Sequence, residues 1–173
     1  MDRRSFVAVA TLGSLVGSTV EAAASTGDAQ AVASLLAEYQ AVWNAGDAAR
    51  MFRLATNDIH WVNIVGMHWQ GRAQVELAHQ VYLEVMFKGV PLMLEGVESV
   101  VPVGTGALSV VARWDMGAFT TPDGKAVPSS KDRMSLVLLR TSDGLKIAHG
   151  ANVQIDPVAQ QFDPVKGPPS VDG

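Results

Sequence analysis

The chain has 173 residues, a net charge of −4 and no cysteine, and 17% of its residues are charged. The acidic balance and the lack of a basic run argue against a nucleic-acid partner, and the absence of cysteine excludes disulfides, thiol catalysis and thiolate metal sites. The charged fraction is below the ~25% of a typical soluble domain, and a homo-oligomer that covers part of the surface is one explanation.

The first residues, "MDRRSFVAVATLGSLVGSTVEAAAS", indicate an export signal. Paired arginines precede an apolar and small-residue run that closes with Ala22-Ala23-Ala24. This order is typical of a secretory signal peptide, and the run is too short for a stable membrane span. The arginine pair is similar to a twin-arginine signal; an ordinary secretion signal is the alternative. We expect residues 1–24 to be removed and the protein to be periplasmic or extracellular.

Residues 25–157 are expected to form one domain, followed by a Pro/Gly-rich tail over residues 158–173. Asp28 is expected to cap a helix that ends at Asn44-Ala45-Gly46, and Asp47 a second, short helix over residues 48–55. The first helix has one apolar face, because its large apolar residues recur at helical spacing: Val32, Leu35, Leu36, Tyr39, Val42 and Trp43.

The stretch "WVNIVGMHWQGRAQVELAH" predicts a hairpin and then a helix. A turn centred on Val65 places Trp61 opposite Trp69 on one face, and leaves His60 and His68 to share the other. A third helix follows over residues 72–87. The rest of the chain has four strand-like segments separated by turns, and helices followed by antiparallel strands predict an α+β fold.

Several strings resemble a known family. "AEYQAVWNAGDAARMFRLATNDIHWVN" resembles the start of SnoaL-like and ketosteroid-isomerase-like domains of the nuclear-transport-factor-2-like superfamily. "WVNIVGMHWQGRAQVELAH" and "KIAHGANVQIDPVAQQFDPVK" are similar, more narrowly, to the SgcJ/EcaC-type family. One departure is visible, because the family's His-Gly-His-Asn-Thr is here His149-Gly150-Ala151-Asn152-Val153. Any role of the two lost groups is therefore in doubt in this chain.

The resemblance implies a cone: a strongly curved antiparallel sheet wrapped around three N-terminal helices, with a pocket at one end and pairing of two copies through the outer sheet face. Superfamily members isomerise, cyclise, dehydrate or hydrolyse small molecules, or only bind them, so the fold does not fix the function.

His79 is the first candidate catalytic residue. It lies in the middle of the apolar stripe of the third helix, one turn before Tyr82, which is a candidate ligand contact. A neutral imidazole suits proton transfer near pH 7. The alternative is a core histidine whose nitrogens are both bonded.

His149 is the second candidate. Alternation along the last strand places it on one face with Ile147, Ala151, Val153 and Ile155, either as a pocket wall or as a dimer surface. The family motif favours the pocket, and it adds Asn152 as a candidate ligand contact.

Three residues of the predicted hairpin are candidate ligand contacts. Trp61, Asn63 and Trp69 offer flat apolar walls and an orienting amide, although each indole can equally seal the core.

Asp115 is a third and weaker candidate catalytic residue. It shares a strand face with Arg113, while Trp114, a further candidate ligand contact, takes the other face. A carboxylate inside the cone can abstract a proton; the alternative is an exterior Arg–Asp pair.

No cofactor or metal is expected. His60, His68 and Asp58 lack tight metal-ligand spacing, and no nucleotide-binding fingerprint is present. The sequence predicts an exported cone-fold protein that binds a small, largely apolar organic molecule, with cofactor-independent acid–base chemistry if it is an enzyme. A non-catalytic binding or dimerisation module is the alternative. A metal-independent carbonic anhydrase is disfavoured, since exported relatives with that activity carry a His-His-His-Ser-Ser tail that this chain lacks.

Overall fold

A computed structural model of the protein describes residues 24–166. The export signal expected over residues 1–24 thus lies outside the described residues except for Ala24, and so does the end of the tail, residues 167–173. The helical elements are α1 (Thr26–Asn44), α2 (Ala48–Met51), η1 (Phe52–Leu54), α3 (Arg72–Val85), η2 (Ala159–Phe162) and η3 (Pro164–Lys166). The strands are β1 (Ala55–Val62), β2 (His68–Gln70), β3 (Leu92–Val103), β4 (Ala107–Met116), β5 (Phe119–Thr120), β6 (Ala126–Val127), β7 (Ser130–Thr141) and β8 (Gly144–Gln154).

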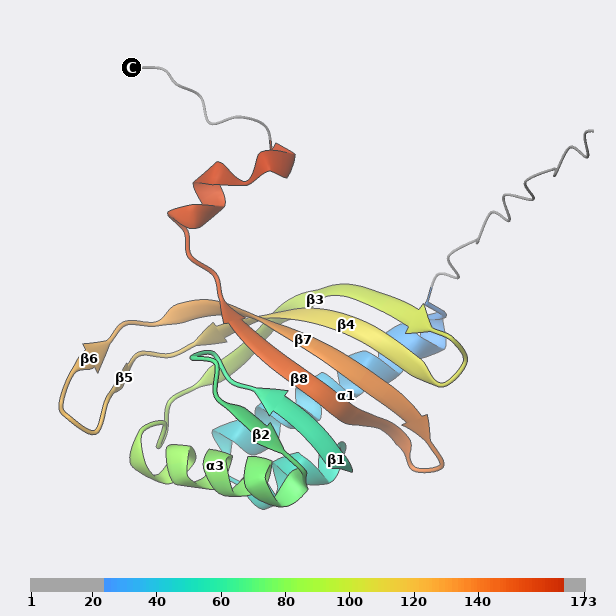
Figure 1. The fold of residues 1–173 in the computed structure, drawn as a ribbon, viewed down its shortest axis with the longest axis horizontal. Helices are drawn as coiled ribbons and strands as arrows, with labels where there is room; N and C mark the ends of the chain where they lie inside the picture. The colour runs from blue at the N-terminus through green and yellow to red at the C-terminus, as the bar shows by residue number, and fades with distance from the viewer. Residues whose placement is uncertain (1–23, 167–173) are drawn as a thin grey trace, which may run out of the picture.

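The expected α+β cone is confirmed. Six strands form one curved sheet in the order β2-β1-β8-β7-β4-β3, and β5 and β6 form a separate small hairpin. Helix α1 runs behind the sheet and α3 closes its lower end (Figure 1). The side of the sheet that faces these helices is called the inner face below, and the other side the outer face.

We expected a wholly antiparallel sheet from the sequence, but the sheet is mixed. Strands β1 and β8 are parallel, while all the other neighbours within the sheet are antiparallel. Strand β1 precedes α3 in the chain and β8 is the last strand. Because no hairpin connects these two strands, they are free to pair in parallel. The first and the last long strands of the domain therefore lie side by side.

Helix α1 starts earlier than the sequence predicted. Ser25, not Asp28, is the N-cap: its hydroxyl accepts a hydrogen bond from the backbone N–H of Asp28 at 3.1 Å. The Asp28 carboxylate accepts one in return from the N–H of Ser25 at 3.2 Å. This reciprocal pair is a capping box, in which the acidic residue occupies the third helical position. The predicted cap of the next helix is confirmed, since Asp47 accepts from the N–H of Arg50 at 2.8 Å.

The predicted hairpin has the predicted register. Trp61 lies opposite Trp69 and Val62 opposite His68. The turn between them is held by Asn63, whose side-chain oxygen accepts from the N–H groups of Val65 and Met67 at 3.2 and 2.8 Å. The hairpin therefore presents one aromatic face inward and one imidazole-bearing face outward.

The core lies between the helices and the inner face. Trp61 fits there because Gly150, its register partner on β8, has no side chain. A Cβ at position 150 would overlap the six-membered ring of the Trp61 indole.

The described part of the tail projects away from the body of the domain (Figure 1). It consists of η2 and η3, and its apolar residues Val158, Phe162 and Val165 are exposed. Within residues 24–166, none of the helices has the length and the apolar character needed to cross a membrane.

Candidate functional site

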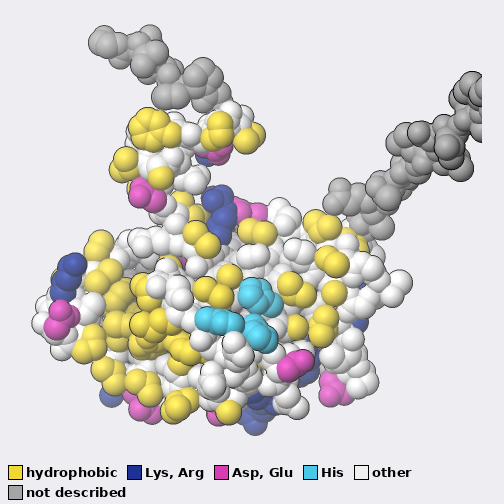
Figure 2. All heavy atoms as spheres, in the orientation of Figure 1, with side chains coloured by type: hydrophobic (Ala, Val, Ile, Leu, Met, Phe, Trp, Pro, Cys, Tyr) yellow, Lys and Arg dark blue, Asp and Glu magenta, His cyan; other side chains and the backbone are white. Residues whose placement is uncertain are grey.

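A cavity of about 400 Å³ lies between the helices and the inner face. Its walls are mostly aromatic and apolar, and apolar side chains gather near the β5–β6 hairpin and α3 (Figure 2). All four tryptophans of the chain line it, together with Tyr39, Tyr82, Phe87 and Phe119. Its polar lining residues are Asn63, His79, Thr121, Ser130, Asp132, Asn152 and Gln154.

Two buried indoles form the floor of this cavity. Trp61 and Trp114 are 0% and 1% exposed and both pack against the Tyr39 ring, at centroid distances of 6.2 and 5.7 Å. Neither indole N–H has a hydrogen-bond partner in the described chain. A buried donor without a partner costs about 1–3 kcal/mol. These two N–H groups therefore offer binding energy to any ligand that brings a hydrogen-bond acceptor.

The asparagines in the cavity wall differ in what they offer. The side-chain oxygen of Asn152 is buried and has no partner among residues 24–166. Asn63 also lines the cavity, but its oxygen is used in the β1–β2 turn. Asn152 is therefore the amide whose oxygen is free to bind a donor group of a ligand.

His79 reaches the cavity from α3 through a cage of aromatic rings. Phe52, Trp61 and Trp69 surround the imidazole at centroid distances of 4.6, 5.4 and 5.6 Å. Its Nδ1 lies 2.8 Å from the carbonyl oxygen of Val75, so Nδ1 carries the proton and Nε2 keeps the lone pair. Burial lowers the pKa of His79 to about 4, against the opposing effect of the Val75 bond. The ring is thus neutral at pH 7 and acts as a hydrogen-bond acceptor.

Asp132 is a cavity residue that was not predicted from the sequence. It lies on β7 directly opposite Trp114, and it lines the cavity. Burial raises the pKa of its carboxyl group, although the hydroxyl of Ser130, which donates to Oδ1 at 3.1 Å, lowers it. Alternation along β7 could have found it, because Asp132 shares the inner face with the buried Met134 and Leu136.

Asp115 lies outside the cavity. Alternation along β4 holds as predicted, with Trp114 buried and Arg113 exposed. The Asp115 carboxylate accepts from Nζ of Lys131 at 2.9 Å on the outer face. Its exterior position corrects its assignment as a base inside the cone.

His149 also lies on the outer face, contrary to the predicted alternation. A register shift in the β7–β8 ladder pairs Leu138 with Ile147 but the preceding Val137 with His149, so Ala148 is an extra residue. Such a bulge turns the following side chains to the opposite face. Ile147 is therefore buried, whereas His149 points outward and Asn152 inward.

Tyr82 is a further predicted ligand contact that the structure places at the cavity. It lines the cavity, packs against Trp69 at 6.0 Å, and donates its hydroxyl to the sulfur of Met67 at 3.3 Å. The predicted residues that the structure brings together around the cavity are Trp61, Asn63, Trp69, His79, Tyr82, Trp114 and Asn152.

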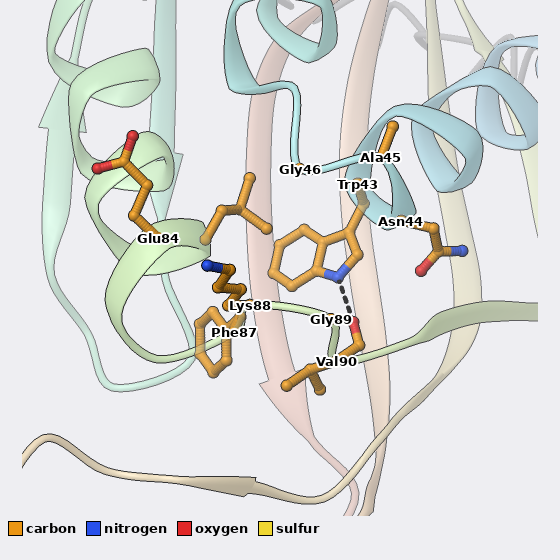
Figure 3. Close-up of a pocket in the computed structure, with 10 residues that line it drawn as sticks. Trp43, Asn44, Ala45, Gly46, Glu84, Phe87, Lys88, Gly89 and Val90 are labelled. Atoms are coloured by element: carbon orange, nitrogen blue, oxygen red, sulfur yellow. Dashed lines mark hydrogen bonds between the residues drawn. The ribbon is translucent and has the colours of Figure 1, made fainter.

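A separate cavity of about 300 Å³ lies between the end of α1 and the loop after α3 (Figure 3). Its polar groups are largely paired: Nε1 of Trp43 donates to the carbonyl of Val90 at 3.1 Å, and the amide of Asn44 is bonded twice to the backbone of Leu92. This cavity offers a ligand fewer free partners than the cone cavity does.

In the described part of the chain, no three His, Cys, Asp or Glu side chains converge as a ready metal site.

No protein-family model and no curated protein matches the chain in sequence. Solved structures do match it. An uncharacterized protein with a cystatin-like fold from Caulobacter vibrioides is 32% identical, over 79% of this chain and 96% of its own, with a TM-score of 0.74.

Two other solved structures share the fold at lower identity. A ketosteroid isomerase-like protein from Erwinia carotovora atroseptica is 15% identical, over 77% of this chain and 100% of its own, with a TM-score of 0.65. An NTF-2 like protein of unknown function from Shewanella oneidensis is 16% identical, over 72% and 97%, with a TM-score of 0.57. The narrower SgcJ/EcaC resemblance stays a prediction.

Proposed function

We propose that this chain, which belongs with the cystatin-like-fold protein of Caulobacter vibrioides, binds a small, largely apolar organic molecule in the cone cavity. The cavity's volume of about 400 Å³ lies in the range of small-molecule pockets. The ketosteroid isomerase-like neighbour is consistent with such a ligand.

The observation that carries the proposal is the set of unpartnered polar atoms in an apolar cavity. The indole N–H groups of Trp61 and Trp114 and the side-chain oxygen of Asn152 are buried without partners. Buried polar groups are nearly always hydrogen-bonded. We therefore expect the ligand to supply the missing hydrogen-bond partners of these atoms. It has an apolar body, a carbonyl or hydroxyl oxygen at the indoles, and a donor group toward Asn152.

Asp132 gives the site a chemistry. As a carboxylate it can take a proton from the carbon next to a ligand carbonyl, and the electron pair of the broken C–H bond then forms an enolate. The indole N–H groups of Trp61 and Trp114 stabilise the negative oxygen. When the ligand carries a C=C bond β,γ to its carbonyl, the enolate extends into a dienolate, and transfer of the proton from Asp132 to the γ-carbon shifts the double bond to the α,β position and completes an isomerisation. A raised pKa makes the carboxylate a stronger base than an exposed aspartate.

The other candidate residues have lesser roles in this proposal. His79 accepts a hydrogen bond at Nε2 rather than carrying a proton, because its pKa of about 4 keeps it neutral. Tyr82 and Trp69 form the wall. His149 and Asp115 take no part, since they lie on the outer face.

The test uses 2-tetralone, a bicyclic ketone, and tetralin, the hydrocarbon of similar shape. Because all four tryptophans line the cavity, quenching of their fluorescence measures binding. We expect the ketone to bind more tightly than tetralin, and Trp114→Phe to reduce that preference by about 5–10-fold, the value of one hydrogen bond. Equal affinity for the two compounds would refute the assigned role of the indoles.

Catalysis is tested with the same ketone in D₂O. Nuclear magnetic resonance follows exchange of the protons next to the carbonyl, and we expect Asp132→Asn to slow the protein-dependent exchange by about 10²-fold or more. Asp115→Asn, a matched change on the outer face, should leave it unaltered. Exchange that survives in Asp132→Asn rules out Asp132 as the base.

Binding without turnover is the second candidate. It is favoured by His79, whose buried ring is held by a hydrogen bond to the backbone and surrounded by aromatic rings. Tight binding of the ketone with no protein-dependent exchange would select this candidate.

We further propose that two copies pair through the outer face. Helices α1 and α3 both pack on the inner side of the sheet, so they leave the outer face uncovered (Figure 1). The middle of the outer face carries small and β-branched residues: Val101, Val111, Ser135, Val137 and Ala151. The low charged fraction of the chain agrees with a covered surface.

A further inference from the structure

We propose that His60 and His68 chelate a late first-row divalent metal ion on the outer side of the β1–β2 hairpin, with Cu²⁺ bound most tightly. This site lies on the face of the hairpin that is turned away from the cone cavity. It does not depend on the proposed function.

The two imidazoles already have the spacing of metal ligands. Nδ1 of His60 lies 3.1 Å from Nε2 of His68, and the ring centroids are 5.2 Å apart. At the usual metal–imidazole distance of about 2.0–2.1 Å, a separation of 3.1 Å gives an N–metal–N angle of about 95–100°. This angle lies between the square-planar and tetrahedral values, so it suits Cu²⁺, Ni²⁺ or Zn²⁺.

The hairpin fixes this spacing. His60 is on β1 and His68 on β2, and the Trp61–Trp69 pair between them anchors the register from the opposite face. Both imidazoles are exposed, so the metal has direct access from solvent. In the metal-free state one ring donates its N–H to the other. On binding, that ring moves its proton to its other nitrogen, which frees both lone pairs.

A third imidazole stands next to the pair. His149 is the register partner of His60 on the parallel strand β8, and the bulge at Ala148 turns it to the same outer face. Imidazoles gather on one part of the surface (Figure 2), where His60 and His68 are exposed and His149 is half-buried. Because no three such groups in residues 24–166 already converge, His60 and His68 are the primary ligands. Water completes the coordination, and His149 lies within reach of a rotamer change.

Imidazole nitrogens are good ligands for these metals, and affinity peaks at Cu²⁺ in the first-row series. The net charge of −4 also attracts cations to the protein. The site is therefore selective for late transition metals over Mg²⁺ and Ca²⁺, which prefer oxygen ligands.

The test is a titration of the metal-free protein, without a histidine tag, with CuCl₂ and separately with ZnCl₂ and MgCl₂. Calorimetry gives stoichiometry and affinity, and electron paramagnetic resonance shows nitrogen coupling on Cu²⁺. We expect one Cu²⁺ per chain, weaker Zn²⁺ binding and no Mg²⁺ binding. His60→Ala and His68→Ala should each weaken Cu²⁺ binding by about tenfold or more.

The matched control is His79→Gln, which removes a buried imidazole and should leave Cu²⁺ binding unchanged. His149→Ala separates the two modes of coordination: a smaller loss of affinity identifies it as a third ligand, and no loss identifies a two-imidazole site. Full Cu²⁺ affinity in both His60→Ala and His68→Ala, with native circular dichroism, overturns the proposal. So does an absence of nitrogen coupling.

Discussion

Asp132 and His79 are titratable groups that face the cavity, and burial moves their pKa values in opposite directions. It raises that of Asp132 and lowers that of His79, because a low-dielectric site disfavours the charged form of each. The cavity therefore disfavours the charged form of each group, although only for His79 is the shift large. A neutral, apolar ligand suits such a lining better than an ionic one.

The lowered pKa of His79 predicts a pH-dependent stability. In the unfolded chain the imidazole takes up a proton near its ordinary pKa of 6.5, whereas in the folded protein it does so only near 4. Stability is therefore complete above pH 6.5 and falls as the pH drops from 6.5 to 4, by roughly 3 kcal/mol. We expect His79→Gln to flatten this part of the curve of unfolding free energy against pH, measured by urea denaturation.

His149→Gln is the control, because it removes an imidazole from the outer face. It should leave the slope between pH 6.5 and pH 4 as in the wild type. If His79→Gln keeps the full slope, the acid sensitivity arises from other groups, and the buried neutral ring is not its cause.

Seven of the residues that line the cavity could be predicted from the sequence. Trp61, Trp69 and Asn63 followed from the hairpin register, and His79 followed from the apolar stripe of the third helix. Asp132 did not follow, because in the sequence it comes directly after a Pro- and Ser-containing stretch that is typical of a turn. Met134 and Leu136 are buried on the same face, but the adjoining turn residues gave no indication that the strand already includes Asp132.

At the scale of the element, β8 shows where counting along a strand fails. Alternation is reliable on β4 and β7, whose ladder is regular over ten pairs. On β8 one extra residue, Ala148, reverses the facing of everything after it. No local sequence feature marks this bulge, since it adapts β8 to two partners at once, the antiparallel β7 and the parallel β1.

The same strand makes a sharp prediction about packing. Gly150→Ala places a methyl group inside the van der Waals envelope of the Trp61 ring. Overpacking of this kind costs typically about 1–3 kcal/mol. We expect Gly150→Ala to lower the unfolding free energy by about that amount in urea denaturation and to change the tryptophan fluorescence of the folded state.

Gly96→Ala on β3 is the matched control, because nothing lies within 4 Å of a Cβ built there. It should be close to neutral. Equal stabilities of the two variants would mean that Trp61 does not occupy the space above Gly150.

At the scale of the whole molecule, the fold was predictable and its sheet topology was not fully so. The order of helices and strands and the family-like strings predicted the cone. The parallel β1–β8 pair depends on which strands meet after the chain has wrapped around, which no local pattern encodes. The fold is thus shared with proteins only 15–16% identical in sequence.

The proposed dimer makes the last prediction. A stable interface buries about 1,200–2,000 Å² in total. An interface of this size on the outer face would cover its apolar middle. We expect light scattering after size-exclusion chromatography to give twice the mass of one chain, and Val137→Lys to give the single-chain mass. Val85→Lys, an equivalent change on the exposed side of α3, should stay dimeric. A wild-type protein of single-chain mass would refute the dimer.

The side-by-side placement of β1 and β8 has a consequence for biosynthesis. During translation, β1 is made long before β8. Until β8 is present, Trp61 cannot pack on Gly150, and the edges of β1 and β7 that pair with β8 are open to other chains. Contacts between such distant segments form slowly. A premature stop codon before Gly144 would therefore yield an aggregation-prone fragment that depends on chaperones, and not a smaller folded domain.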